Sequence, residues 1–271
     1  MAATGWRIAL ASEVGTSHRK QGNPCQDHAQ ATLLATSEGQ VLVAVASDGA
    51  GSAARAAVGS RLVCESLVAA ASAHFRDGGR LSRLTRKNAV GWIGTIGKAL
   101  SARARAEGHA LRDYSSTLLA AIVGTEAAAF LQIGDGAIVT SDRLSTGWAY
   151  LFWPQHGAFA NTTNFVTATD AARRLDFDLS RRRIDEVALF TDGIENLVLH
   201  HASRSVHAPF FDDIFKPVRE SKAKGLDPGL SASLKHYLAR AQLAERTDDD
   251  KTLILATRAM ATAGAARKAV R

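Results

Sequence analysis

Three aspartates in the chain, each followed by a glycine, stand at the end of a short apolar stretch. The pairs are Asp48-Gly49, Asp135-Gly136 and Asp192-Gly193. A single Asp-Gly pair is a strong turn signal in its own right, and Asp77-Gly78, which follows a segment of helical character, needs no other explanation. Three carboxylates at the ends of three interior strands could also meet at one sheet edge and bind a cation.

An acidic triplet adds to this set near the end of the chain. Asp248, Asp249 and Asp250 immediately precede the last apolar stretch, residues 252–256. Packing like charges together costs stability unless a positive charge compensates them. Because no histidine or cysteine occurs at matching spacing, the expected ligands are oxygens, which indicates Mg²⁺ or Mn²⁺ rather than zinc.

Nine short stretches rich in apolar and β-branched residues are typical of strands. Many are separated by only a few turn residues, so neighbours are expected to pair antiparallel as hairpins. The predicted strands cover residues 6–11, 31–35, 41–46, 117–123, 127–133, 138–140, 148–153, 187–190 and 252–256.

Helical segments are predicted at residues 52–75, 83–107, 194–200, 209–222 and 228–244. Ser52 is expected to cap the first, with Val58, Leu62, Leu67 and Val68 on one face. The two longest helices separate two groups of strands, which argues against a doubly wound parallel sheet. Two stacked, mainly antiparallel sheets flanked by helices, an α+β fold, fit this order best.

The helix at residues 83–107 carries glycines at positions 91, 94 and 97. Each costs about 1 kcal/mol of helix propensity relative to alanine. Close packing of this helix against a neighbour would explain their presence. Without a linker or an internal repeat, residues 1–258 are expected to form one domain, followed by a basic tail at 259–271 without fixed structure.

The composition is that of a globular protein. Of 271 residues, 46% are hydrophobic and 22% charged, which excludes a disordered chain. No apolar run approaches the roughly 20 residues of a membrane span, and the first eleven residues lack the order of a secretory signal, so a cytoplasmic protein is expected. In that reducing compartment Cys25 and Cys64 are expected to be free thiols.

The net charge of +7 would suit an acidic partner, although surface arginines are most often simply solvated. A nucleic-acid binder is disfavoured, because interleaved aromatic residues and a recognisable groove-reading motif are missing from the sequence.

Six short motifs resemble, in this order, those of the metal-dependent protein phosphatases of type 2C. The divergent bacterial branch of that family is the most similar, since Asp-Gly-Ala-Gly-Ser replaces the commoner Asp-Gly-His-Gly. The resemblance spans about residues 8–256. The motifs are Gly15-Thr-Ser-His18 with Asn23-Pro-Cys-Gln26-Asp27, then Ser47-Asp48-Gly49-Ala-Gly51, Ser115-Ser-Thr117, Gly134-Asp135-Gly136, Thr191-Asp192-Gly193 and Asp249-Asp250-Lys-Thr252.

The resemblance implies a four-layer α-β-β-α sandwich with two Mn²⁺ or Mg²⁺ ions in a cleft at one end of the sheets. By position, Asp48 would bridge both ions, Asp192 and Asp249 would complete the first site, and the Gly49 carbonyl would bind the second. Asp135 matches an aspartate that some members use for a weaker third ion. Asp27 and Asp250 would support the ligands from behind.

The activity implied by the resemblance is hydrolysis of phosphoserine and phosphothreonine in proteins. A water activated by the metals would attack phosphorus directly, without a phosphoenzyme. The implied partner is a phosphorylated protein, such as a serine/threonine kinase or its target.

Three positions depart from the family pattern. Gln26 stands where many members have a glutamate, so it would add no charge to the second metal site. Gly22 stands where an arginine often clamps the phosphate, for which His18, Arg19 and Lys20 are the nearby substitutes. Ala50 replaces the histidine proposed to protonate the leaving group; His156 is a candidate for that task, which stays unassigned. These departures leave open an alternative, a catalytically weak module that binds a phosphoprotein or kinase.

Overall fold

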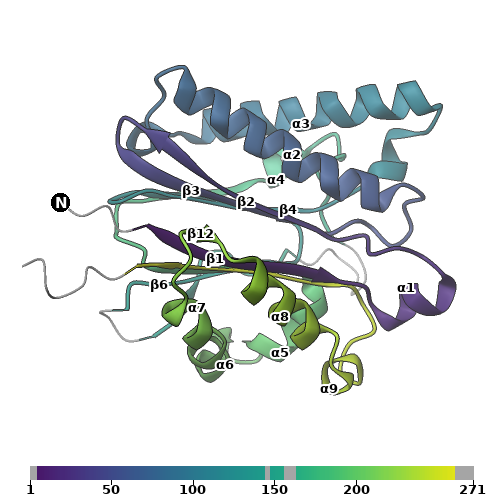
Figure 1. The fold of residues 1–271 in the computed structure, drawn as a ribbon. Coiled ribbons are helices and arrows are strands. Elements are labelled where there is room, and N and C mark those ends of the chain that lie inside the picture. The colour runs from purple at the N-terminus through teal and green to yellow at the C-terminus, as the bar shows by residue number, and fades with distance from the viewer. Residues whose placement is uncertain (1–4, 144–146, 156–162, 260–271) are drawn as a thin grey trace, which may run out of the picture.

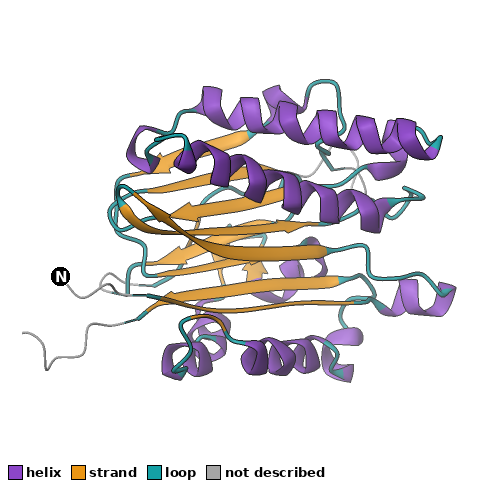
Figure 2. Cartoon of the chain, turned by 45° about the horizontal axis from the view of Figure 1, so that its top comes forward, coloured by secondary structure: helices purple, strands orange, loops and turns teal. Residues whose placement is uncertain are grey.

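The computed structural model describes residues 5–143, 147–155 and 163–259. Two β-sheets lie face to face, and helices cover the outer face of each, so the molecule has four layers in the order α-β-β-α (Figures 1 and 2). This confirms the predicted fold class. His156 and the tail beyond residue 259 lie outside the described residues.

The upper sheet of Figure 1 is antiparallel throughout and has the order β2-β3-β4-β5-β8. Its central strands are buried along their whole length because both of their faces are covered. The strands are β2 (His28–Thr36), β3 (Gly39–Ser47), β4 (Leu118–Val123), β5 (Ala128–Ile133) and β8 (Asp176–Ser180).

The lower sheet has the order β12-β1-β13-β9-β6-β7 and is antiparallel except for the short β12–β1 pair. A separate small hairpin is formed by β10 (Leu199–His200) and β11 (Ser205–Val206). The strands of the lower sheet are β1 (Trp6–Glu13), β6 (Ala137–Ser141), β7 (Ala149–Tyr150), β9 (Glu186–Phe190), β12 (Gly225–Leu226) and β13 (Lys251–Arg258).

Helices on the upper side are α2 (Ala56–Arg76), α3 (Arg86–Glu107) and the short α4 (Ala171–Arg174). Helices below the lower sheet are α5 (Glu195–Val198), α6 (Ala208–Ile214), α7 (Lys216–Glu220) and α8 (Pro228–Leu238). The remaining helices are α1 (Thr16–Gln21) and α9 (Ala241–Ala244), and 3-10 turns lie at Leu81–Arg83, Leu111–Tyr114 and Asp192–Ile194.

Three apolar cores follow from this layering. One lies between the upper helices and the upper sheet, with Leu67 and Ile96 fully buried in it. The second fills the space between the two sheets and includes Leu42 and Phe130. The third lies between the lower sheet and the lower helices and contains Phe211. Successive side chains of the central strands therefore point alternately into two different cores. A shift of one residue would move each side chain into the wrong core, so this alternation fixes the register of the sheets.

Helix α2 differs from the expectation in two respects. It begins at Ala56, and Arg55 rather than Ser52 occupies the capping position, without a side-chain cap. Its fully buried face is formed by Val63, Cys64, Leu67 and Ala71, while Val58, Leu62 and Val68 lie half-buried beside it. By length and composition alone α2 would be long and apolar enough to cross a membrane; here its apolar face packs on β2 and β3.

Two strand expectations also need correction. The predicted strand at residues 148–153 is reduced to β7, two residues long, and β8, β10, β11 and β12 were not expected. Consecutive strands β5 and β6 do not form a hairpin, because β6 joins the lower sheet and pairs with β9. This crossing places the Asp135 turn at the point where the chain passes between the sheets.

Close packing does not explain the glycines of α3. A Cβ atom built on Gly91, Gly94 or Gly97 would meet nothing within 4 Å. By contrast, a Cβ on Gly59 of α2 would collide with the Tyr114 carbonyl group. Of these four helical glycines, only Gly59 is therefore required by its surroundings.

We expect Gly94→Ala to raise the free energy of unfolding by about 0.5–1 kcal/mol, because alanine restricts the unfolded chain and meets no obstacle in the helix. Gly59→Ala should lower it by at least about 1 kcal/mol, since the backbone of residue 114 must move. Urea unfolding of both variants measures the two effects. A loss of stability in Gly94→Ala would contradict this account of α3.

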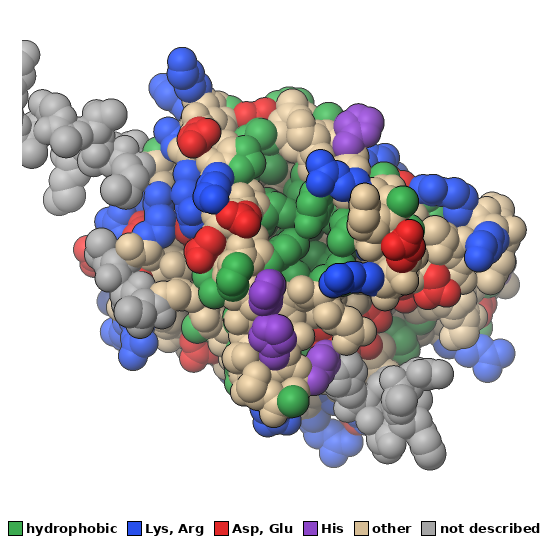
Figure 3. Space-filling model, turned by 90° about the horizontal axis from the view of Figure 1, so that it is seen from below, with side chains coloured by type: hydrophobic (Ala, Val, Ile, Leu, Met, Phe, Trp, Pro, Cys, Tyr) green, Lys and Arg blue, Asp and Glu red, His purple; other side chains and the backbone are tan. Residues whose placement is uncertain are grey.

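The underside of the molecule carries a hydrophobic hollow in the middle of its face (Figure 3). Its volume is about 530 Å³, its floor includes Ala9 and Leu255 of the lower sheet, and its walls come from α6, α7 and α8, including Ile214 and Leu234. It lies on the helical side of the lower sheet.

Candidate metal and phosphate site

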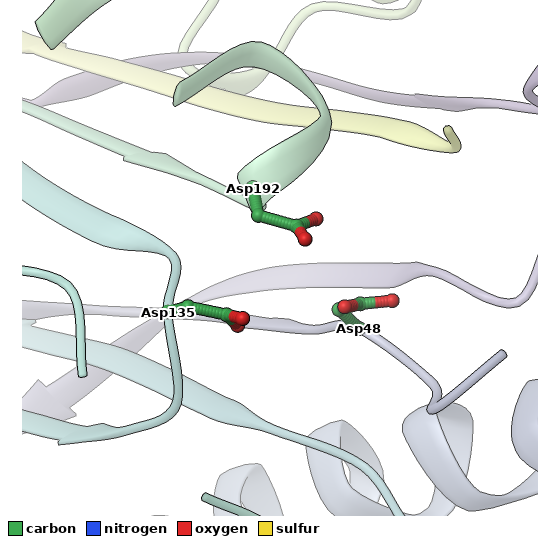
Figure 4. A group of neighbouring side chains, drawn as sticks. All are labelled: Asp48, Asp135 and Asp192. Atoms are coloured by element: carbon green, nitrogen blue, oxygen red, sulfur yellow. The ribbon is translucent and has the colours of Figure 1, made fainter. Parts of the chain in front are cut away.

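The three Asp-Gly turns meet in space. Asp48 follows β3, Asp135 follows β5 and Asp192 follows β9. One carboxylate oxygen from each lies within 4.8 Å of the others, and the side chains point toward a common space between the turns (Figure 4). Three strands from two sheets therefore deliver their carboxylates to the same end of the sandwich.

The Ser115–Thr117 motif fixes the turn that carries Asp48. The hydroxyl of Thr117 accepts a hydrogen bond from the backbone N–H of Asp48 at 2.9 Å, and the N–H of Thr117 donates to the Asp48 carbonyl at 2.8 Å. The N–H of Ala50 donates to the Ser115 carbonyl at 2.9 Å. With its backbone bonded on both sides, the turn holds the Asp48 side chain toward the cleft.

Two glycines pack directly on the acidic turn before β13. A Cβ on Gly193 would overlap the Asp250 carbonyl oxygen, and one on Gly15 would overlap the carbonyl groups of Asp248 and Asp249. Both positions therefore require glycine for the close approach of the backbones. This contact brings Asp249 into the neighbourhood of Asp192.

Asp250 points inward and is 1% exposed. Its carboxylate accepts hydrogen bonds from the N–H groups of Gly15 at 2.6 Å and Gln26 at 2.5 Å. It thus ties the start of α1 and the Gln26-Asp27 segment to the turn that carries Asp249.

Gln26 and Asp27 are buried behind the strand ends. One oxygen of Asp27 accepts a hydrogen bond from the Thr191 hydroxyl at 2.7 Å. The other, together with the amide oxygen of Gln26, is enclosed and has no hydrogen-bond partner among the described residues. An unsatisfied buried acceptor costs about 1–3 kcal/mol, so these oxygens fit a cation or its water ligands.

A cleft of about 600 Å³ opens over the three Asp-Gly turns, and Gln26, Asp27 and Asp250 are not among its described lining residues. The structure brings the predicted residues His18, Asp48, Gly49, Asp135, Asp192 and Asp249 to its wall, and Ala50 also faces it. Asp249 belongs to the lining but not to the tight triplet of Asp48, Asp135 and Asp192. Sequence reasoning missed Ser52, Thr163 and Phe165; the last two come from a loop without a motif.

The remaining basic candidates lie elsewhere. Arg19 is turned away and pairs with Glu13 at 2.6 Å, and Lys20 is exposed on α1 outside the cleft wall. Gly22 ends α1 in a left-handed conformation. Of the three proposed phosphate contacts, only His18 therefore reaches the cleft. Cys25 and Cys64 are free thiols, as predicted.

The carboxylates shift one another's protonation. Burial, together with the charges of Asp27 and Asp192, raises the pKa of Asp48 well above its usual range. Burial followed by the charges of Asp135 and Asp249 raises the pKa of Asp192 to about 8, and burial raises the pKa of Asp27 to about 6. The pKa of Asp249 is raised as well, mainly by burial. Gathering these groups is therefore unfavourable at neutral pH without a compensating positive charge.

The donor set matches a hard divalent cation. The triplet of Asp48, Asp135 and Asp192 offers carboxylate oxygens, which Mg²⁺ and Mn²⁺ prefer, whereas zinc favours thiolate and imidazole ligands. The place of the triplet, at a cleft between the ends of two sheets, defines the chain as an α-β-β-α sandwich protein with an acidic cation site.

Comparison with known proteins places this architecture in a family. The sequence matches the family described as protein phosphatase 2C over residues 14–239. It is 38% identical over 252 residues to serine/threonine-protein phosphatase 3 of Escherichia coli strain K12, covering 93% of this chain and 98% of that protein. The chain belongs to the protein phosphatase 2C family.

Solved structures agree with this assignment at the level of the fold. The S. agalactiae serine/threonine phosphatase has a TM-score of 0.60 at 15% identity, with 93% of this chain and 99% of that chain covered. The catalytic domain of the serine/threonine protein phosphatase PstP, solved with two manganese ions, has a TM-score of 0.57 at 15% identity, with 94% and 99% covered.

The raised carboxyl pKa values predict a pH-dependent stability without metal. Because of these raised pKa values, the folded chain binds more protons than the unfolded chain. The free energy of unfolding should therefore fall as the pH rises through about 6, the pKa of Asp27, and then through about 8, the pKa of Asp192. Urea unfolding in EDTA at both pH values measures this slope. We expect Mn²⁺ to stabilise the protein more at the higher pH, and Asp192→Asn to flatten the slope in EDTA. A metal-free stability that increases over this range would contradict the electrostatic account.

Proposed function

We propose that this protein is a metal-dependent phosphatase that hydrolyses phosphoserine and phosphothreonine in proteins by direct attack of water on phosphorus. One observation carries the proposal: carboxylates from segments far apart in the sequence line a single open cleft, where their charges repel one another. Family membership and the 38% identical relative, a serine/threonine phosphatase by name, support the same reaction.

Two Mn²⁺ or Mg²⁺ ions would be held mainly by groups that line the cleft, with Gln26 reaching them from behind the strand ends. Asp48 would serve both ions, Asp192 and Asp249 the first, and the Gly49 carbonyl and Gln26 the second, with Asp27 and Asp250 behind them. Since Asp135 is within reach of both Asp48 and Asp192, it would bind a third ion. The manganese-bound structure of PstP supports two ions in this fold.

When bound, the cations would activate a water molecule and neutralise the negative charge of the phosphate. The chain's own residues supply position and access. The Ser115–Thr117 contacts fix the Asp48 turn. The cleft lining next to Asp48 consists of the small residues Gly49, Ala50 and Gly51. A phosphorylated side chain on a protein surface could therefore reach the acidic centre without a deep tunnel.

The alternative, a weak module that only binds phosphoprotein, is not favoured. All the carboxylates expected of the first ion line the cleft, whereas a binding module would have no need to gather repelling charges. We further propose that residues 1–258 act as one domain, that the protein works in the cytoplasm, and that its substrates include a serine/threonine kinase or that kinase's targets.

Turnover of p-nitrophenyl phosphate and of a phosphothreonine peptide should require Mn²⁺ and vanish in EDTA. Asp192→Asn should lower kcat on both substrates by on the order of 10²–10³-fold, because a metal ligand and its charge are lost. Steady-state kinetics with a coupled phosphate assay measures both substrates.

Asp77→Asn is the matched control, since Asp77 is also followed by glycine but lies exposed at the end of α2. We expect its activity to equal that of the wild type. Equal rates in Mn²⁺ and EDTA, or undiminished activity of Asp192→Asn, would refute the proposed reaction. Phosphopeptide binding without turnover would establish the binding module instead.

A further inference from the structure

The cleft holds one basic side chain among its described lining residues. Those residues are His18, Asp48, Gly49, Ala50, Gly51, Ser52, Asp135, Thr163, Phe165, Asp192 and Asp249. Ala50 offers no proton, and the described part of the cleft wall contains no lysine, arginine or tyrosine. Apart from the aspartates, which the proposed ions would need as ligands, His18 has the one ionisable side chain among the described lining residues, and an imidazole ring can donate a proton from nitrogen.

The structure holds His18 in place from two directions. Helix α1 is anchored to the acidic turn, because the N–H of Ser17 donates to the Asp248 carbonyl at 2.9 Å and Gly15 packs against the same turn. The Nδ1 atom of the ring lies 3.0 Å from an oxygen of Asp250. The side chain of His18 is only 12% exposed, so it is mostly enclosed while it still borders the cleft.

Asp250 is suited to orient this ring. Its carboxylate is 1% exposed and is fixed by two backbone N–H donors, from Gly15 and Gln26. The contact is at ion-pair distance and lacks the geometry of a hydrogen bond, so the Asp250 carboxylate acts on the ring through its charge and stabilises it when both ring nitrogens carry protons. Since Nδ1 faces Asp250, Nε2 is the nitrogen that remains for the cleft.

We propose that His18 is the general acid of the reaction, oriented by Asp250, and that it replaces in function the side chain missing at Ala50. As the oxygen of the attacking water bonds to phosphorus, the bond between phosphorus and the leaving oxygen breaks, and the proton on Nε2 passes to that oxygen. The products are a serine or threonine hydroxyl and inorganic phosphate, and the proton released by the attacking water returns through solvent to the neutral imidazole. The inference rests on the proposed phosphatase function.

The other charged side chains of the described cleft wall are acidic, and behind the wall the buried Lys251 ammonium donates to the Asp249 carbonyl at 3.0 Å. Asp249 and Asp250 face it from the turn before β13, and Asp48 and Asp192 lie on the same cleft wall. Arg19, the next residue on α1, is engaged by Glu13. No described basic side chain of the cleft wall competes with His18 for the leaving oxygen.

The test compares leaving groups. A phosphothreonine ester leaves as a poor, strongly basic alkoxide and needs a proton, whereas p-nitrophenolate leaves readily without one. We expect His18→Gln to lower kcat on a phosphothreonine peptide by about 10²-fold or more, and on p-nitrophenyl phosphate by less than about tenfold, with KM little changed. His18→Arg, which keeps a positive charge that does not give up its proton, should show the same selective loss.

Arg19→Gln, a basic residue of the same helix outside the cleft, is the matched control and should keep wild-type rates on both substrates. Mn²⁺ binding measured by calorimetry should be unchanged in both His18 variants, which separates proton transfer from a loss of metal. Wild-type turnover of p-nitrophenyl phosphate in Mn²⁺ tests the phosphatase function itself, so an inert wild type refutes that function. If the wild type is active, three outcomes would overturn the assignment of His18. They are equal losses of kcat on the two substrates in His18→Gln, no loss of kcat in that variant, or full activity of His18→Arg on the peptide.

Discussion

Repulsion among buried carboxylates is the constraint on which this structure depends. Asp48, Asp135 and Asp192 come within 4.8 Å of one another, and the pKa of Asp192 is raised to about 8. The three aspartates meet because the ends of three strands from two sheets lie at one place. Their mutual repulsion lowers the stability of the fold, and a bound cation would compensate it.

The scaffold supplies the free energy that holds the repelling groups together. Three apolar cores stabilise the four layers, while short polar contacts at the strand ends set the positions of individual side chains. Thr117 fixes the Asp48 turn, Thr191 bonds Asp27, and Asp250 joins two distant backbone segments. The family's short motifs thus serve two purposes: some residues face the cleft, and others hold those residues still.

The departures from the family pattern become understandable in the same terms. Gln26 is buried with an unpaired amide oxygen, so the amide removes one more repelling charge while an oxygen atom is kept at this position. Gly22 ends α1 with positive φ, and the imidazole of His18 on that helix is the basic group at the cleft wall. The chemistry available at this site therefore depends on which side chains reach the cleft, and less on whether each motif position carries the residue usual in the family.

The sequence by itself determined the family, the α+β layering and most of the acidic residues, because strand alternation and Asp-Gly turns are local patterns. It misplaced the start and face of α2 and overlooked β8, since those depend on packing partners supplied from elsewhere in the chain. Only the tertiary structure decided that Asp249 lies outside the tight triplet of Asp48, Asp135 and Asp192, that Arg19 turns away, and that His18 meets Asp250. These contacts join residues as many as 232 positions apart, and local patterns carry no information on such distances.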